Sequence, residues 1–194
     1  MKNATALVIA TVAEKGAGKG LFFELVTKLL PNKRVAMIRS SDPWREILGV
    51  LCKDESRDNI SLLATAIRNA FRDDGILVPV MQRRLKTTDA DIIIIDGFRK
   101  PEELSLIRQL GGVVVYIAAS PEIRFQRRSA NAETTDEEGM SWEQFMRQEQ
   151  AATETSIRNM GETMANLQIE NNGTPKQFEE KIHAFLDTHV IPRV

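Results

Sequence analysis

The chain has 194 residues and a net charge of −1, with 42% hydrophobic and 27% charged residues. These values are ordinary for a globular protein with a sizeable core, and we expect one domain over residues 1–194. Because the chain has no overall basic field, we expect no nucleic acid and no anionic membrane as its main partner.

The first predicted elements are a buried strand over residues 4–12, a glycine-rich turn and a helix over residues 19–30. Gly16 and Gly18 can adopt angles that turn successive N–H groups toward one anion, and the helix N-terminus adds positive potential. Lys19 supplies a mobile ammonium group. This context indicates a nucleotide phosphate site formed by Lys15, Gly16, Ala17, Gly18, Lys19, Gly20 and Leu21.

This loop departs from a complete Walker A pattern at two positions. Ala13 stands where the first glycine is usual, and Gly20 stands where Ser or Thr would hold magnesium. The alternative is a strand-to-helix turn without a ligand. The glycine spacing, the lysine and the preceding strand together favour the phosphate site.

A short second strand is predicted over residues 34–38, and residues 42–87 after it look like an insertion. Helices are predicted from the Asp42-Pro43 step, over residues 59–74 and after Pro79. Asp42 can be a turn former or a residue that orients an acceptor or a base. The candidate substrate-binding cations of the insertion are Arg45 and Arg68.

Residues 91–96 give the strongest strand signal, a β-branched run typical of a central parallel strand. Asp96 ends this strand, where a carboxylate can hold the Mg²⁺ of a bound nucleotide; the alternative is a turn or capping Asp. Arg99 follows at the carboxyl end of the strand and is a candidate for both catalysis and substrate binding. A helix is predicted over residues 101–110.

A strand over residues 113–118 leads to a helix that carries Arg124 and Arg128 on one face, as expected for residues four apart. We expect these two arginines to contact the transferring phosphoryl group, since phosphoryl transfer depends on charge neutralisation. Residues 126–150 look like a lid insertion that includes an acidic run at 133–138, and a helical pattern extends from 142 to 164.

The last predicted elements are a strand over residues 167–170, a turn over 171–175 and an amphipathic helix over 175–189. Strands that alternate with helices indicate an α/β fold with a parallel sheet and right-handed crossovers. Both insertions would then lie near the carboxyl ends of the strands, where open α/β sheets bind ligands.

Several motifs resemble those of the nucleoside monophosphate kinase branch of the P-loop kinases, the adenylate-kinase-related and dephospho-CoA-kinase-like proteins. Residues 16–20 resemble the loop of that group, in which glycine after the lysine is normal, although Leu21 replaces the usual Thr. Residues 96–99 resemble its Asp-Gly-Phe-Pro-Arg element without the proline. Residues 41–45 are similar to the start of its acceptor-binding segment, and residues 119–128 to its helix before the lid.

The resemblance implies a three-layer α/β/α fold with a five-stranded parallel sheet in the order 2-3-1-4-5. It implies ATP and Mg²⁺ as cofactors, with Asn171 and Gly173 in the loop that packs on the adenine. It also implies transfer of a phosphoryl group to a small phosphorylated acceptor, a (deoxy)nucleoside monophosphate or a similar nucleotide, which Arg99 would bind together with Arg45 or Arg68.

Two alternatives to a kinase stay open: a nucleotide-binding switch or ATPase without a small acceptor, and a degenerate kinase that does not turn over. The single cysteine, Cys52, has no internal disulfide partner, and we expect it to be a small buried hydrophobe. No signal peptide is evident and no apolar run is long enough to span a membrane, so we expect a cytoplasmic protein. We expect it to be a monomer or a homodimer.

Overall fold

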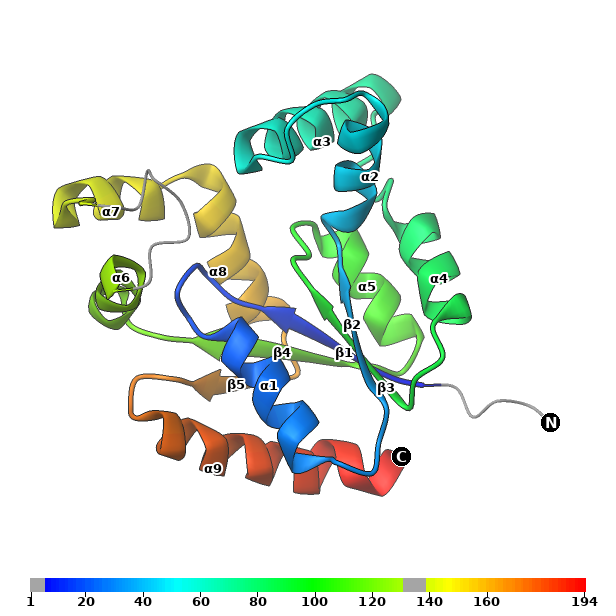
Figure 1. Cartoon of the computed structure of the whole chain (residues 1–194), viewed down its shortest axis with the longest axis vertical. Coiled ribbons are helices and arrows are strands. Elements are labelled where there is room, and N and C mark those ends of the chain that lie inside the picture. The colour runs from blue at the N-terminus through cyan, green and yellow to red at the C-terminus, as the bar shows by residue number, and fades with distance from the viewer. Residues whose placement is uncertain (1–5, 131–138) are drawn as a thin grey trace.

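In residues 6–130 and 139–194, which the computed structural model describes, the chain forms a five-stranded parallel sheet with helices on both faces (Figure 1). The sheet order is β2-β3-β1-β4-β5, which confirms the predicted order. The strands are β1 (Leu7–Val12), β2 (Val35–Arg39), β3 (Ile92–Asp96), β4 (Val113–Ala118) and β5 (Leu167–Glu170).

The apolar run in β3 explains its central place in the sheet. Successive side chains of a strand point to opposite faces, so a strand covered by helices on both sides must be apolar throughout. Ile92 and Ile94 join the hydrophobic cluster on one face of the sheet, and Ile93 and Ile95 join the cluster on the other.

Each of the two clusters is completed by a different set of helices. On one face Phe22 of α1 (Lys19–Leu29) and Phe178 of α9 (Pro175–Phe185) pack against the sheet. The other face is covered by the helices α4 (Val78–Thr87), α5 (Pro101–Gln109) and α8 (Ala152–Met164).

The expected insertion over residues 42–87 consists of two parts. Helices α2 (Asp42–Val50) and α3 (Arg57–Phe71) stand beyond the carboxyl end of β2, at the top of Figure 1. They pack on each other through a separate small cluster of Trp44, Ala64 and Leu77. Helix α4 instead lies on the sheet, where Met81 is fully buried.

The helical pattern predicted over residues 142–164 corresponds to two helices rather than to one. The chain forms α7 (Trp142–Glu149) and α8, separated by a bend at which Ala151 is extended. The helical spacing continues across this bend because both helices have an inward face, but the faces meet different neighbours. Phe145 of α7 packs beside the arginines of α6 (Pro121–Ala130), whereas Ile157 of α8 packs on the sheet.

Two smaller expectations were wrong. Cys52 is exposed, with a positive φ of 53° just after α2, because the chain turns there away from the small cluster. The last helix changes at Leu186 into a π-helical turn, Leu186–Val190. The acidic run over residues 133–138 lies outside the described residues. In the described part of the chain, no helix has both the length and the apolar character needed to cross a bilayer.

The close approach of α8 to β4 generates a stability prediction. A Cβ at Gly161 would lie 2.4 Å from the Tyr116 ring, whereas nothing lies within 4 Å of a Cβ at Gly49 in α2. We expect Gly161→Ala to lower the free energy of unfolding by about 1–3 kcal/mol through overpacking, and Gly49→Ala to be neutral or slightly stabilising. Urea denaturation of both variants checks this, and equal stability of the two would contradict the close packing.

Candidate active site

The turn between β1 and α1 has the backbone geometry of an anion-binding loop. Gly16 and Gly18 have φ values of 77° and 108°, in the left-handed region that favours glycine. Gly18 caps α1 at its N-terminus, and Lys19 is the first residue of the helix. Residues 16–20 therefore present N–H groups and the positive end of the helix dipole at the carboxyl edge of the sheet, as a nucleotide phosphate requires.

Two side chains from later segments hold the loop from outside. The Asn171 amide donates to the carbonyl of Ala17 at 2.8 Å, and a Cβ at Gly18 would lie only 2.3 Å from that nitrogen. Arg127 donates to the carbonyls of Gly16 and Asn171 at 3.4 and 2.9 Å. Asn171, expected at the adenine, is thus placed directly against the loop, and Gly173 lies two residues further along the same turn.

Lys19, the first residue of α1, meets Asp96 beside the carboxyl ends of the neighbouring strands β1 and β3. Their Nζ and Oδ1 atoms are 3.3 Å apart, and each side chain is about three-quarters buried, with 25% and 22% exposed. Thr11, opposite Asp96 in the β1–β3 pairing, donates to the same Oδ1 atom at 3.3 Å. Within the described residues no three His, Cys, Asp or Glu side chains form a metal-binding group, so Asp96 would share Mg²⁺ with phosphate oxygens and water.

Arg39 is a further cation at this edge and was not among the predicted site residues. It ends β2 and is paired in register with Asp96 of β3, so the two side chains share a face of the sheet. Its side chain is exposed, and in the part of the chain described here its guanidinium makes no hydrogen bond or ion pair. Its position at the end of β2, next to the strand that carries Asp96, is the sequence feature that could have identified it as a site residue.

The predicted acceptor-binding residues of α2 already have partners within the chain. The Arg45 guanidinium forms an ion pair with Glu55 at 3.3 Å, and the two side chains are 41% and 52% exposed. The Asp42 carboxylate accepts from the Arg39 backbone N–H at 3.3 Å and lies 3.9 Å from the Arg84 guanidinium. Asp42 therefore acts in the turn that starts α2.

Arg68 and Arg99 are connected through one buried carboxylate. Glu103 of α5 accepts from the Arg68 guanidinium at 3.0 Å and from the Arg99 backbone N–H at 2.7 Å. Burial raises the pKa of Glu103, and these donors partly offset the effect. Arg68 thus contributes to the position of the Arg99 segment, and in the described residues the Arg99 guanidinium makes no hydrogen bond or ion pair.

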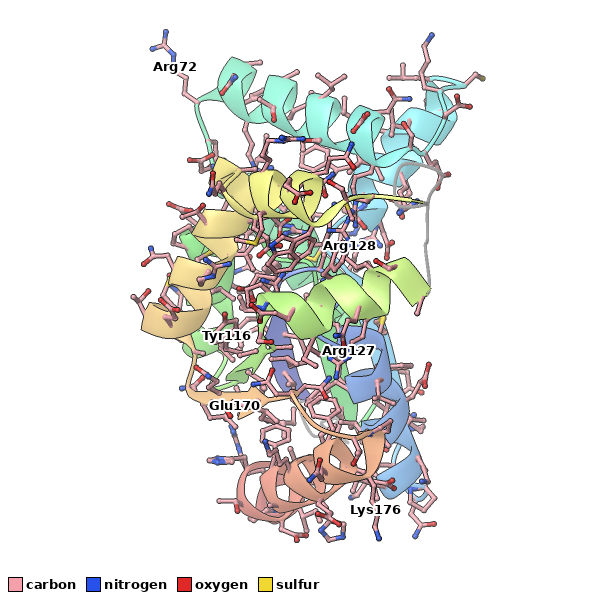
Figure 2. All side chains as sticks on the ribbon, turned by 90° about the vertical axis from the view of Figure 1, so that its left-hand side faces the viewer. Arg72, Tyr116, Arg127, Arg128, Glu170 and Lys176 are labelled. Atoms are coloured by element: carbon pink, nitrogen blue, oxygen red, sulfur yellow. The ribbon has the colours of Figure 1, made fainter. Side chains whose placement is uncertain are left out.

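The two arginines predicted on the transferring phosphoryl group face α7. Arg124 is 1% exposed and donates to Glu149 at 2.7 Å and to the Lys15 carbonyl at 3.3 Å. Arg128 donates to Gln148 at 3.2 Å. Figure 2 shows Arg128 on the α7 side of α6, with Arg127 on the opposite side. These contacts occupy the Arg124 guanidinium, which was predicted to contact the transferring phosphoryl group.

Glu14, also missed, is a buried carboxylate within the loop segment. It is 3% exposed and accepts from the Tyr116 hydroxyl at 3.0 Å and from Arg158 at 3.0 Å. The partners lie 102 and 144 residues away in the chain, so no local pattern signals the contact.

Two solved structures with a similar fold are shikimate kinases. One from Acinetobacter baumannii, in complex with shikimate, has a TM-score of 0.54 and 19% identity over 97% of each chain. Another from Bacteroides thetaiotaomicron has a TM-score of 0.57 and 14% identity, covering 93% of this chain and 96% of that one. The chain therefore has the same fold as these shikimate kinases.

Relatives by sequence cover almost the whole chain. A UPF0200 protein from Saccharolobus solfataricus is 26% identical over 188 residues, 94% of each chain. A UPF0200 protein from Hyperthermus butylicus is 22% identical over 195 residues, 96% of each chain. No protein-family model matches the sequence.

The single tyrosine provides a direct test of the contact with Glu14. Burial and the Glu14 charge both raise the pKa of Tyr116 above its usual range. We expect the folded protein to form no tyrosinate near pH ~10, where the unfolded chain titrates, and its stability to fall as the pH rises above that value. Glu14→Gln should shift the ionisation to lower pH.

Ultraviolet absorbance of tyrosinate measures this titration, with the urea-unfolded chain as the reference. Half-ionisation of the folded wild-type protein at the same pH as the unfolded chain would contradict the buried contact.

Proposed function

We propose that this protein is an ATP-dependent kinase that transfers the γ-phosphoryl group to a small anionic acceptor. The observation that carries the proposal is the junction of the glycine-rich loop with Lys19 and Asp96, 3.3 Å apart at the carboxyl edge of a P-loop kinase sheet. Loop amides and Lys19 would bind the β- and γ-phosphates. Bound Mg²⁺ would supply charge neutralisation between the phosphates, with Asp96 as its protein ligand.

The acceptor we favour is phosphorylated, a (deoxy)nucleoside monophosphate or a similar nucleotide. Arg39 is the last residue of β2, and Arg99 lies three residues after the end of β3. Both therefore flank the strand end that carries Asp96. Neither guanidinium has a partner among the described residues, so both are available to an anion without loss of an existing ion pair. An acceptor anion next to Asp96 requires such cations to offset its charge.

The second candidate is a nucleotide-gated switch or ATPase without a small acceptor. It is favoured by Leu21, which has no hydroxyl for a phosphate, and by the engagement of Arg45 with Glu55 and of Arg68 with Glu103. Lid closure in a kinase excludes water, so a kinase turns over slowly without its acceptor, whereas a switch does not respond to one.

Loss of the Lys19 ammonium tests the nucleotide site. We expect Lys19→Ala to lower ATP turnover at least about a hundredfold, because one charged donor to the transferring phosphates is lost. Lys28→Ala on the same helix, where Lys28 pairs with Glu179 at the surface, is the matched control and should be near normal. Rates of ADP release measure both variants, and near-normal turnover of Lys19→Ala would remove the phosphate-site assignment.

Loss of the Arg99 guanidinium tests the acceptor side. We expect Arg99→Ala to raise the KM of the acceptor by about 10- to 100-fold while the KM of ATP changes little, as for the loss of a charged hydrogen bond to one substrate. Arg83→Ala, an exposed arginine on α4, is the control. Equal effects on both substrates would place Arg99 on the nucleotide instead.

A further inference from the structure

A connected set of four charged side chains begins and ends in the phosphate loop. Glu14 accepts from Nε of Arg158 on α8 at 3.0 Å, and Arg158 also donates to Glu149 at the end of α7 at 3.1 Å. Glu149 pairs with Arg124 of α6, and Arg124 donates to the backbone carbonyl of Lys15 at 3.3 Å. We refer to Glu14, Arg158, Glu149 and Arg124 as the charge ring.

The charge ring is buried and electrically balanced. Glu14, Arg124 and Glu149 are 3%, 1% and 4% exposed, and only Arg158, with 38% of its side chain exposed, reaches solvent. The charges alternate: Glu149 lies between Arg124 and Arg158, and Glu14 pairs with Arg158, so each guanidinium has a carboxylate partner. Tyr116, beside α8 in Figure 2, adds a hydroxyl donor to Glu14.

Stability alone is a weak explanation for such an arrangement. The desolvation of buried ions offsets most of their attraction, and apolar residues of similar volume stabilise a core as well or better. A hydrogen-bonded ionic set does fix relative positions, because each removal leaves a charge buried without its partner. Here the fixed positions are those of Glu14 and Lys15, directly before Gly16.

We propose that the charge ring is a positioning device for the nucleotide site, in which Arg158 and Glu149 act on the phosphate loop through Glu14 and Arg124. The inference rests on one part of the proposed function, namely that the phosphate loop binds a nucleotide. It makes the orientation of the loop amides depend on α7 and α8. Nucleotide affinity is therefore coupled to residues of α7 and α8.

The test is a double-mutant cycle on the affinity for Mg-ADP, measured by titration calorimetry, a readout that needs no turnover. We expect Glu14→Gln and Arg158→Gln each to raise the Kd for Mg-ADP about tenfold. The double variant should also show a Kd raised about tenfold and no more, because each single substitution already breaks the ion pair between Glu14 and Arg158. Arg158→Lys, which keeps the charge, should recover part of the affinity.

Arg108→Gln is the matched control. Arg108 donates to the Met164 carbonyl at the end of α8 but has no contact with the charge ring in the described structure, so this variant should leave Kd unchanged. Thermal unfolding of each variant reports any loss of stability separately. Unchanged Kd with lowered Tm in Arg158→Gln would overturn the inference, and so would additive effects of about a hundredfold in the double variant.

Failure of this inference is distinguishable from failure of the proposed kinase activity. Wild-type protein that binds Mg-ADP with the coupling above, but that no acceptor stimulates, would refute the kinase proposal and support the charge ring. Acceptor-stimulated turnover together with an unchanged Kd in Arg158→Gln would support the kinase proposal and refute the role of the charge ring.

Discussion

The parallel pairing of β1 with β3 is the constraint on which the candidate site depends. It sets Thr11 opposite Asp96 and brings the phosphate loop, which follows β1, beside the only carboxylate of β3. A shift of one residue would turn the Asp96 side chain to the other face of the sheet, away from Lys19. The pairing is held by the isoleucines of β3, whose side chains are buried on both faces. Hydrophobic packing thus determines the geometry of the charged site.

A second level of organisation connects this site to the helices at the edge of the sheet. The loop is held from one side by Asn171 and Arg127 and from the other by the charge ring. Asn171, Arg127 and Arg124 donate to backbone carbonyls of the loop, so these three contacts use none of its N–H groups. The arginines of α6 therefore have a physical role before any substrate is bound.

The sequence predicted those parts of the molecule that depend on local patterns. The β-branched run of β3 and the glycine spacing before α1 are such patterns, and the five strands formed where they were expected. The sheet order, which the family resemblance implied, was also confirmed. The bend between α7 and α8 was missed because both helices carry an apolar face, and periodicity does not record which neighbour each face meets. Cys52 was expected to be buried on the basis of its residue type alone, but the turn after α2 exposes it.

The side-chain contacts of the candidate site were largely beyond sequence reasoning. Glu14 and Arg158, or Arg68 and Glu103, come from distant segments, and each residue alone has the ordinary pattern of a surface charge. Position at a strand end did indicate Asp96 and Arg99, and the same criterion applied to β2 would have indicated Arg39. The roles of the remaining site residues stay predictions.

The most direct test of the central claim is the release of ADP from Mg-ATP with and without a panel of acceptors. The panel contains ribo- and deoxynucleoside monophosphates, dephospho-CoA and phosphomevalonate, with shikimate as a carboxylated acceptor that lacks a phosphate. We predict slow ATP hydrolysis without an acceptor and marked stimulation by one phosphorylated acceptor, with a phosphorylated product formed in equal amount to ADP. ATP hydrolysis at the same rate with every acceptor and with none would contradict it.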